Sequence, residues 1–223
     1  MRRFQHRQEA GQLLALELGH YGNRNDVIIL ALPRGGVPVG KEISHILNAP
    51  MDVLVVRKLG VPGHEEMAMG AIATGGIRLL NHPMISALHL SADSVAQVER
   101  RELAELMRRE KLYRGSLPPL ETTKKTVILV DDGIATGSTM QAAIASLRQR
   151  HVDRIVVATP VAPPSVVEIL RQLADEVVSV ITPQDFRGVG QWYDDFSQTS
   201  DEEVHRLLGT SPHDLPHLQL LHS

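Results

Sequence analysis

The sequence contains no cysteine, so the chain can form neither a disulfide framework nor a thiolate metal site, and it has no cysteine nucleophile. Because disulfides are typical of oxidising compartments, we expect a cytoplasmic protein. The sequence also has no uncharged apolar run of about 18 residues, so we predict no membrane-spanning helix. The N-terminal residues MRRFQHRQEA carry early arginines with no apolar stretch behind them, so no secretory signal is predicted.

An excess of charge of one sign is lacking as well. The 23 basic and 26 acidic residues leave a net charge of −3, so non-specific nucleic-acid binding through a broad basic face is not expected. Hydrophobic residues make up 43% of the chain and charged residues 22%, as in ordinary soluble proteins. The length of 223 residues favours a single domain over 1–223.

Five short runs rich in β-branched residues give the main secondary-structure signal. They lie at 27–32, 51–56, 126–131, 154–159 and 176–181. Helical patterns separate them, at 37–48, 91–114, 139–150 and 163–173. Nearly continuous apolar runs are typical of strands covered on both faces, and alternation of strand and helix indicates a parallel sheet with crossover helices. The sequence therefore predicts a doubly wound α/β fold with a mainly parallel sheet of about five strands.

The stretch between the second and third runs is long for a crossover. Residues 58–90 are irregular apart from two short β-like pieces, at 68–73 and 77–80. The helix expected over 91–114 mixes four arginines with four glutamates in 99–110, which favours a solvated or dimer-facing surface; a partner-binding basic strip is the alternative. We expect a homodimer.

The segment VILVDDGIATGSTM, 127–140, is the most informative in the chain. A buried strand would deliver Asp131 and Asp132 to its carboxyl end, where open parallel sheets bind ligands. Glycines and hydroxyl residues then lead into a helix N-terminus: Gly133, Thr136, Gly137, Ser138 and Thr139. Such a helix start suits a phosphate, and paired carboxylates suit vicinal hydroxyls or a hydrated divalent cation. We predict a ribose 5-phosphate site; a polar turn with one aspartate as helix cap is the alternative.

Four apolar residues, two acids and a TGST loop resemble the motif with which type I phosphoribosyltransferases bind 5-phosphoribosyl 1-diphosphate (PRPP). The resemblance extends over about 26–182 and is particularly close to stand-alone bacterial phosphoribosyltransferase-domain proteins without an assigned acceptor. It implies that Asp131 and Asp132 fix the ribose and hold Mg²⁺ through water. It also implies a substrate-binding loop made of Gly133, Ile134, Ala135, Thr136, Gly137, Ser138 and Thr139.

Two further elements agree with this resemblance. LPRGGVPVG, 32–40, is similar to the family's pyrophosphate loop, which implies that Arg34 and the N–H groups of Gly35 and Gly36 face the diphosphate. Family members hold this loop in a strained turn, so we expect a cis or distorted peptide at Arg34–Gly35. In VVRKLG, 55–60, the resemblance implies that Arg57 and Lys58 reach pyrophosphate oxygens; a solvated basic pair is the alternative.

The insertion at about 59–90 occupies the place of the family's flexible catalytic loop. Its glycines suit a closing lid: Gly60, Gly63, Gly70, Gly75 and Gly76. His64, Glu65 and Glu66 are candidates for proton or metal chemistry, with exposed loop residues as the alternative. A small hood over the acceptor would come from 1–25 and 183–223.

The chain has one tryptophan, three tyrosines and three phenylalanines, and four of these aromatics fall between positions 186 and 196. They are Phe186, Trp192, Tyr193 and Phe196. A flat acceptor stacked on Trp192 or Tyr193 would explain the cluster. A small satellite core or a dimer contact is the equal alternative.

The resemblance implies Mg²⁺-dependent transfer of the phosphoribosyl group from PRPP to a nitrogenous acceptor, with Arg34 and Lys58 neutralising the departing diphosphate. Ala135 stands where 6-oxopurine members carry an aspartate, so hypoxanthine and guanine are not expected as acceptors. One alternative is a PRPP- or nucleotide-binding regulator without turnover. Another is an enzyme that cleaves PRPP or phosphorolyses nucleosides with the same residues.

Overall fold

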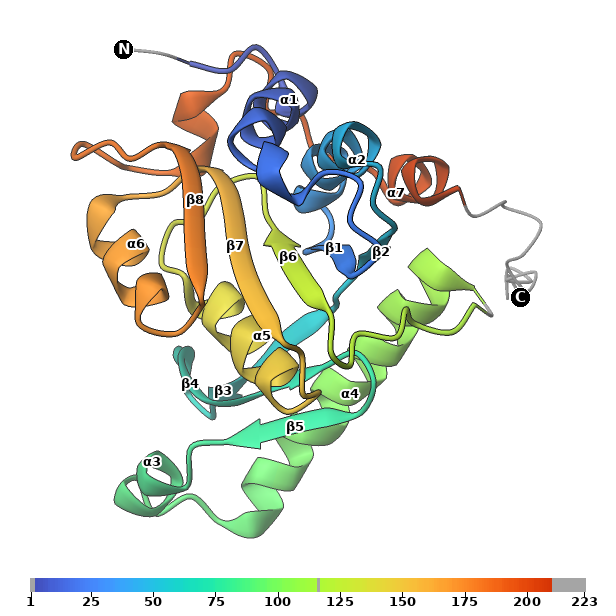
Figure 1. Ribbon diagram of the computed structural model, residues 1–223. Helices are drawn as coiled ribbons and strands as arrows, with labels where there is room; N and C mark the ends of the chain where they lie inside the picture. Colours follow the sequence, from blue (N-terminus) through green and yellow to red (C-terminus); the bar gives the residue numbers. More distant parts are fainter. Residues whose placement is uncertain (1–2, 116, 210–223) are drawn as a thin grey trace, which may run out of the picture.

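A five-stranded parallel sheet forms the centre of the computed structural model, which describes residues 3–115 and 117–209 (Figure 1). In spatial order its strands are β2 (Met51–Val53), β1 (Val27–Ala31), β6 (Thr126–Val130), β7 (Arg154–Val161) and β8 (Glu176–Ile181). Each neighbouring pair is parallel; Ile29 of β1, for example, is in register with Ile128 of β6. The predicted doubly wound α/β fold is confirmed.

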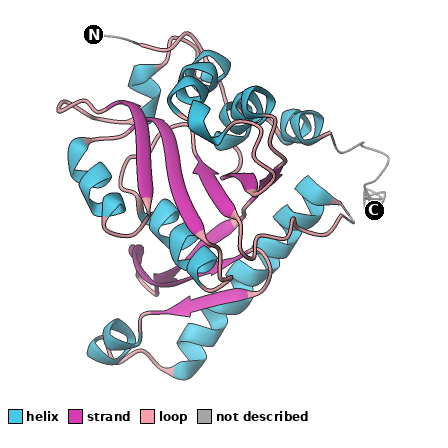
Figure 2. Cartoon of the chain, in the orientation of Figure 1, coloured by secondary structure: helices cyan, strands magenta, loops and turns pink. Residues whose placement is uncertain are grey.

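Helices cover both faces of this sheet, as Figure 2 shows. On one face, α1 (Arg7–Glu17) and α2 (Gly36–Leu47) pack against Ile29, Ile128 and their neighbours. On the other face, α5 (Ser138–Arg148) and α6 (Pro164–Arg171) pack against Ile28, Leu129 and theirs. Successive side chains of a strand point to opposite faces, so these continuous apolar runs supply both cores at once. None of the helices described is long and apolar enough to cross a membrane.

The run 51–56 does not form one strand, contrary to the prediction. Leu54 still donates its N–H to Ala31 of β1 (3.0 Å), but Val55 donates to Thr74 Oγ1 (3.0 Å) and accepts from the Thr74 N–H (2.9 Å). The chain therefore leaves the parallel sheet between these two residues and begins a second one.

The insertion forms a sheet of its own, in which strands include both predicted β-like pieces, 68–73 and 77–80, and also residues 58–61 and 64–67, which the sequence predicts to be irregular. β3 (Val56–Val61), β4 (His64–Ala73) and β5 (Ile77–Leu80) are antiparallel in that order. Gly63 (φ 79°), Gly75 (φ 82°) and Gly76 (φ 77°) form the turns between them, which uses their left-handed conformation for hairpins. Two helices follow, α3 (His82–Ala87) and the long α4 (Ala92–Arg114), and α4 packs on β3 and β4.

The N-terminal segment pairs with residues 192–194 at the carboxyl edge of the parallel sheet. Phe4 donates its N–H to Trp192 O (2.8 Å), and Asp194 donates to Phe4 O (2.8 Å). Phe4, Trp192 and Tyr193 share a small buried core with Val161 at the end of β7. The remaining elements are the short turns η1 (Gly19–Tyr21) and η2 (Val189–Trp192) and the helix α7 (Asp201–Leu208). The part of the expected hood beyond Gly209 lies outside the described residues.

Candidate active site

Two loops meet where β1 and β6 end. Leu32 donates its N–H to Val130 O (2.8 Å), so the loop that follows β1 runs beside Asp131 and Asp132. A Cβ on Gly36 would lie 2.6 Å from Val130 O, and one on Gly35 would lie 2.1 Å from Asp132 Oδ2. Only glycine fits at both positions. The structure thus brings the two sequence motifs into direct contact.

The cis peptide bond of this loop joins Pro33 and Arg34, so the expected position, Arg34–Gly35, is wrong by one residue. Gly35 already has helical dihedral angles (φ −60°, ψ −34°) because α2 begins directly after it. The guanidinium of Arg34 lies 3.6 Å from Asp201 Oδ1 at the start of α7. The hydroxyl of Tyr113 donates to that same oxygen (3.0 Å). Asp201 thereby connects the loop to α4 and α7.

The predicted phosphate loop, residues 133–139, has a solvent-facing part and a buried part. Gly137, with φ 75°, caps α5, and Thr136 Oγ1 lies 3.2 Å from Ser138 Oγ beside this helix start. Ala135, Thr136 and Thr139 are exposed, so hydroxyls and helix N–H groups face solvent together. N–H groups of a helix start and hydroxyls of this kind bind anions.

Gly133 and Ile134 have packing roles in this structure. The Ile134 side chain is 4% exposed, and its N–H donates to Val161 O (2.9 Å). A Cβ on Gly133 would lie 2.3 Å from Val189 Cγ1. Both residues fix the loop against the core and η2, and the predicted contact of each with substrate stays a prediction.

The two carboxylates are held differently. Asp131 Oδ1 accepts the N–H of Asp132 (2.9 Å), and burial, together with the adjacent charge of Asp132, raises the pKa of Asp131 well above its usual range. Asp132 Oδ2 accepts a hydrogen bond from Arg7 Nε (2.8 Å), a residue of α1. An environment that disfavours two bare charges favours ligands that bring hydrogen-bond donors or a cation.

Arg7 is a site residue that sequence patterns do not reveal. Its Nη1 donates to Ser197 O (2.7 Å), and its guanidinium lies 4.1 Å from the ring centroid of Phe196. The hydroxyl of Tyr193 donates to the backbone O of Asp132 (2.6 Å). Arg7 belongs to no motif and is 125 positions from Asp132, so no local signal could have identified it.

The basic pair Arg57 and Lys58 lies in β3 and lines a cavity together with Thr139 of the phosphate loop. This cavity of about 210 Å³ is bounded by Val56, Arg57, Lys58, Gly60, Glu65, Arg101, Glu102 and Thr139. Arg57 donates from Nε (2.9 Å) and Nη2 (2.5 Å) to Oε2 of Glu102, which is buried in α4. Glu102 is a second residue that no sequence motif marks. It orients Arg57 and offsets its charge.

Comparison with known proteins identifies the family. The model of the phosphoribosyl transferase domain matches residues 5–196. The chain belongs to the phosphoribosyl transferase domain family.

The names of two curated relatives agree with this assignment, and a solved structure is similar to most of the chain. "Putative phosphoribosyl transferase Rv0571c" of Mycobacterium tuberculosis (strain ATCC 25618 / H37Rv) is 44% identical over 214 residues, which is 96% of this chain and 48% of the relative. The corresponding protein of strain CDC 1551 / Oshkosh matches to the same extent. The chain spans about half the length of these curated relatives. The crystal structure of TT1426 from Thermus thermophilus is 41% identical, with a TM-score of 0.82, and the match covers 93% of this chain and 98% of that one.

The aromatic cluster of this phosphoribosyl transferase domain is mostly interior. Trp192 is 3% exposed and Tyr193 1%, both in the satellite core with Phe4, whereas Phe196 is 38% exposed. The structure therefore favours the satellite-core alternative, and Trp192 presents no open face on which an acceptor could stack. Of the lid candidates, His64 and Glu65 are exposed, while the side chain of Glu66 lies outside what the structure describes.

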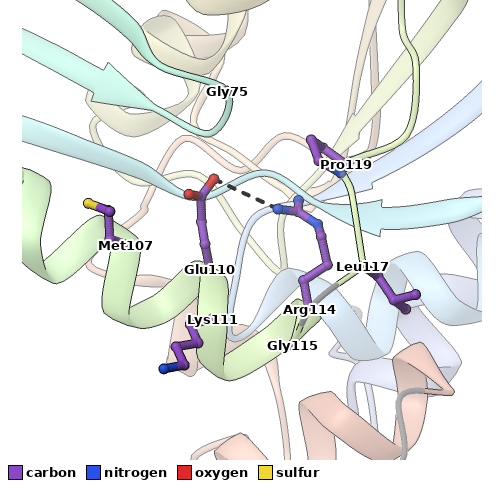
Figure 3. Close-up of a pocket in the computed structure, with 8 residues that line it drawn as sticks. All are labelled: Gly75, Met107, Glu110, Lys111, Arg114, Gly115, Leu117 and Pro119. Atoms are coloured by element: carbon purple, nitrogen blue, oxygen red, sulfur yellow. Dashed lines mark ion pairs between the residues drawn. The ribbon is translucent and has the colours of Figure 1, made fainter. Parts of the chain in front are cut away.

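A second cavity, of about 320 Å³, lies between α4 and the β4–β5 turn (Figure 3). Arg114 on its wall is paired with Glu110 (3.7 Å) and with Asp52 (3.0 Å). The residues that line it are Gly75, Met107, Glu110, Lys111, Arg114, Gly115, Leu117 and Pro119. None of these residues belongs to the carboxyl-edge motifs, so this cavity is separate from the predicted phosphoribosyl site.

The acidic side chains of the domain fit Mg²⁺ only if substrate and water supply most of its ligands. Among the residues described, no group of three or more histidine, aspartate or glutamate side chains could hold a metal ion. Mg²⁺ commonly binds through one or two carboxylates and keeps water and substrate oxygens as its other ligands. Asp131 and Asp132 suit that arrangement, with the substrate supplying the remainder.

Proposed function

We propose that this chain is a Mg²⁺-dependent phosphoribosyltransferase that moves the 5-phosphoribosyl group from PRPP to a nitrogenous acceptor and releases diphosphate. One observation carries the proposal: a carboxylate pair, a glycine loop and a hydroxyl-rich helix start lie together at one edge of the sheet. These groups match the hydroxyls, diphosphate and 5-phosphate of one molecule. The family assignment supports the same reaction class.

Each group has a role in this reaction. Asp131 and Asp132 would accept hydrogen bonds from the ribose hydroxyls, and the helix start at 135–139 would hold the 5-phosphate. Arg34 and Lys58 would stabilise the charge that grows on the diphosphate as its bond to the anomeric carbon breaks. Mg²⁺ held at the acid pair would supply further positive charge for the diphosphate. The β3–β4 hairpin, in the insertion expected to act as a lid, would exclude water from this step.

The acceptor class is narrowed by Ala135. This residue is exposed beside the phosphate loop and can neither accept nor donate a side-chain proton. We infer that the acceptor is not a 6-oxopurine, which leaves adenine-like, pyrimidine and other nitrogenous acceptors. The proposal also includes a cytoplasmic homodimer, for which the exposed Leu103 (42%) and Met107 (59%) on α4 supply an apolar contact surface.

A second candidate is a PRPP- or nucleotide-binding regulator without turnover. Two of the cations expected to meet the diphosphate are already paired with acids, Arg34 with Asp201 and Arg57 with Glu102. A site whose cations stay paired would bind the substrate without stabilising the leaving group. PRPP cleavage without an acceptor is the remaining alternative.

The deciding experiment measures PRPP binding by calorimetry with and without Mg²⁺, and then diphosphate release with a panel of bases and amines. Binding with acceptor-dependent release is expected. Binding without release favours the regulator, and release without acceptor favours cleavage. The double variant Asp131→Asn/Asp132→Asn should lose Mg²⁺-dependent binding, whereas Asp185→Asn, at an exposed ion pair with Arg187, should not. Unchanged affinity in the double variant would contradict the proposed site.

A further inference from the structure

Arg7 lies at the junction of three segments that are distant in the sequence. It is the first residue of α1, and its side chain is 10% exposed. Its Nε donates to Asp132 Oδ2 (2.8 Å) and its Nη1 to Ser197 O (2.7 Å), while its guanidinium plane covers Phe196 at 4.1 Å. A planar guanidinium with two directed hydrogen bonds and an aromatic contact has little freedom to rotate.

Asp132 is confined in turn on its other sides. A Cβ at position 35 would lie 2.1 Å from its Oδ2, so the 33–36 loop closes one side of the carboxylate. Tyr193 donates its hydroxyl to the backbone O of Asp132 (2.6 Å), which fixes the main chain at the same residue. Because Oδ2 is hydrogen-bonded to Arg7, the orientation of Oδ1 is determined by Arg7 and Tyr193, which lie outside the family motif.

We propose that Arg7 is a positioning residue of the ribose site, which holds Asp132 in one orientation and supplies the positive charge that allows two adjacent carboxylates to remain at the sheet edge. This inference rests on the proposed function. It gives the N-terminal segment and residues 193–197 a role in PRPP binding, as the support of Arg7.

The chemistry of the side chain determines what a substitution should do. Lysine at position 7 would keep the charge but lose the second directed hydrogen bond and the planar contact with Phe196. Methionine would keep the apolar stem and remove the charge, which leaves the partly buried Asp132 next to Asp131 without its cationic partner. We expect the dissociation constant for PRPP with Mg²⁺ to rise about fivefold in Arg7→Lys and about 30-fold or more in Arg7→Met, since charge-assisted bonds are the strong ones.

The test compares three ligands by calorimetry on the full chain: PRPP with Mg²⁺, ribose 5-phosphate and inorganic phosphate. A positioning role predicts that both Arg7 variants lose affinity for the two ribose ligands and keep the wild-type affinity for inorganic phosphate, which needs only the helix start. Arg171→Met is the matched control, because Arg171 is an exposed arginine of α6 that pairs with Glu168 at the surface (side chains 60% and 67% exposed) and belongs to neither supporting segment. This control should bind all three ligands as the wild type does.

Two results would overturn the inference. The first is equal affinity of the wild type and the Arg7 variants for the ribose ligands. The second is a parallel loss of affinity for inorganic phosphate, which would indicate general damage to the site. If Arg7→Met does not fold, the test uses Arg7→Lys and Phe196→Leu instead, and the second of these removes the ring beneath the guanidinium. Both should lose affinity for the ribose ligands and keep affinity for inorganic phosphate. A wild-type protein that binds PRPP and ribose 5-phosphate no better than phosphate would instead contradict the proposed function, and the inference with it.

Discussion

Gly35→Ala tests the contact between the two motifs directly. The new methyl group would lie 2.1 Å from Asp132 Oδ2 and 2.5 Å from its Cγ, far inside van der Waals contact. The backbone itself accepts alanine, because φ −60° and ψ −34° are ordinary helical angles. The whole cost therefore comes from the collision with the carboxylate.

The carboxylate must move by more than an ångström, which breaks its 2.8 Å contact with Arg7. Inserting a methyl group into a packed site costs about 1–3 kcal/mol, and separating a buried ion pair adds to this cost. We expect the free energy of unfolding to fall by about 2–4 kcal/mol, and PRPP affinity to fall with it.

Urea unfolding of four proteins measures this cost: wild type, Gly35→Ala, Asp132→Ala and the double variant. Because Asp132→Ala removes the atoms that collide, Gly35→Ala should cost less than about 0.5 kcal/mol in that background, with a coupling energy of about 2 kcal/mol or more. Gly19→Ala is the control, since a Cβ there has nothing within 4 Å. Equal costs of Gly35→Ala in both backgrounds would refute the reasoning.

Three further predictions concern other parts of the chain. Asp201→Asn should tighten diphosphate binding about threefold in calorimetry, because it removes a negative charge 3.6 Å from Arg34; weaker binding would mean that Asp201 orients Arg34 instead. Hydrogen bonds from Arg108 and Arg109 lower the pKa of Glu105 to about 2, so its stabilising contribution is complete above about pH 5 and is lost as the pH falls towards 2. The urea midpoint of Glu105→Gln should accordingly vary less than that of wild type over this range, and identical slopes would contradict this. Trp192, the single tryptophan and 3% exposed, should be quenched by iodide at least about fivefold less in the folded than in the urea-unfolded protein, whereas comparable quenching would contradict its burial.

Local pattern predicted the fold class and the positions of most elements. The apolar runs at 27–32, 126–131 and 154–159 correspond to β1, β6 and β7, because strands covered on both faces need continuous apolar sequence. The prediction of a single strand over 51–56 was wrong for the same reason, because the apolar run continues from the parallel sheet into β3. Only hydrogen bonds to residues distant in the sequence show that the chain leaves the parallel sheet after Leu54.

The lid and the aromatic cluster depended on longer-range contacts. Glycines in 59–76 are compatible with a mobile loop and with hairpin turns alike, and the antiparallel pairing of β3 with β4 decides for the turns in this structure. Aromatics at 186–196 are compatible with a binding platform or a core. The pairing of Phe4 with residues 192–194 decides for a core, and the sequence contains no short-range sign of it.

Residues adjacent along the chain were enough to predict the chemistry of the site, because a strand, two acids and a glycine-hydroxyl helix start fold into adjacent positions in space. The partners that hold those groups come instead from distant segments. Arg7 reaches Asp132 from 125 positions away and Glu102 reaches Arg57 from 45, while Asp201 reaches Arg34 from the far end of the described chain. Charged residues are common on helix surfaces, and nothing in a helix's own sequence states which of its charges will be buried against a distant loop. That choice is made only when the helices pack against the sheet.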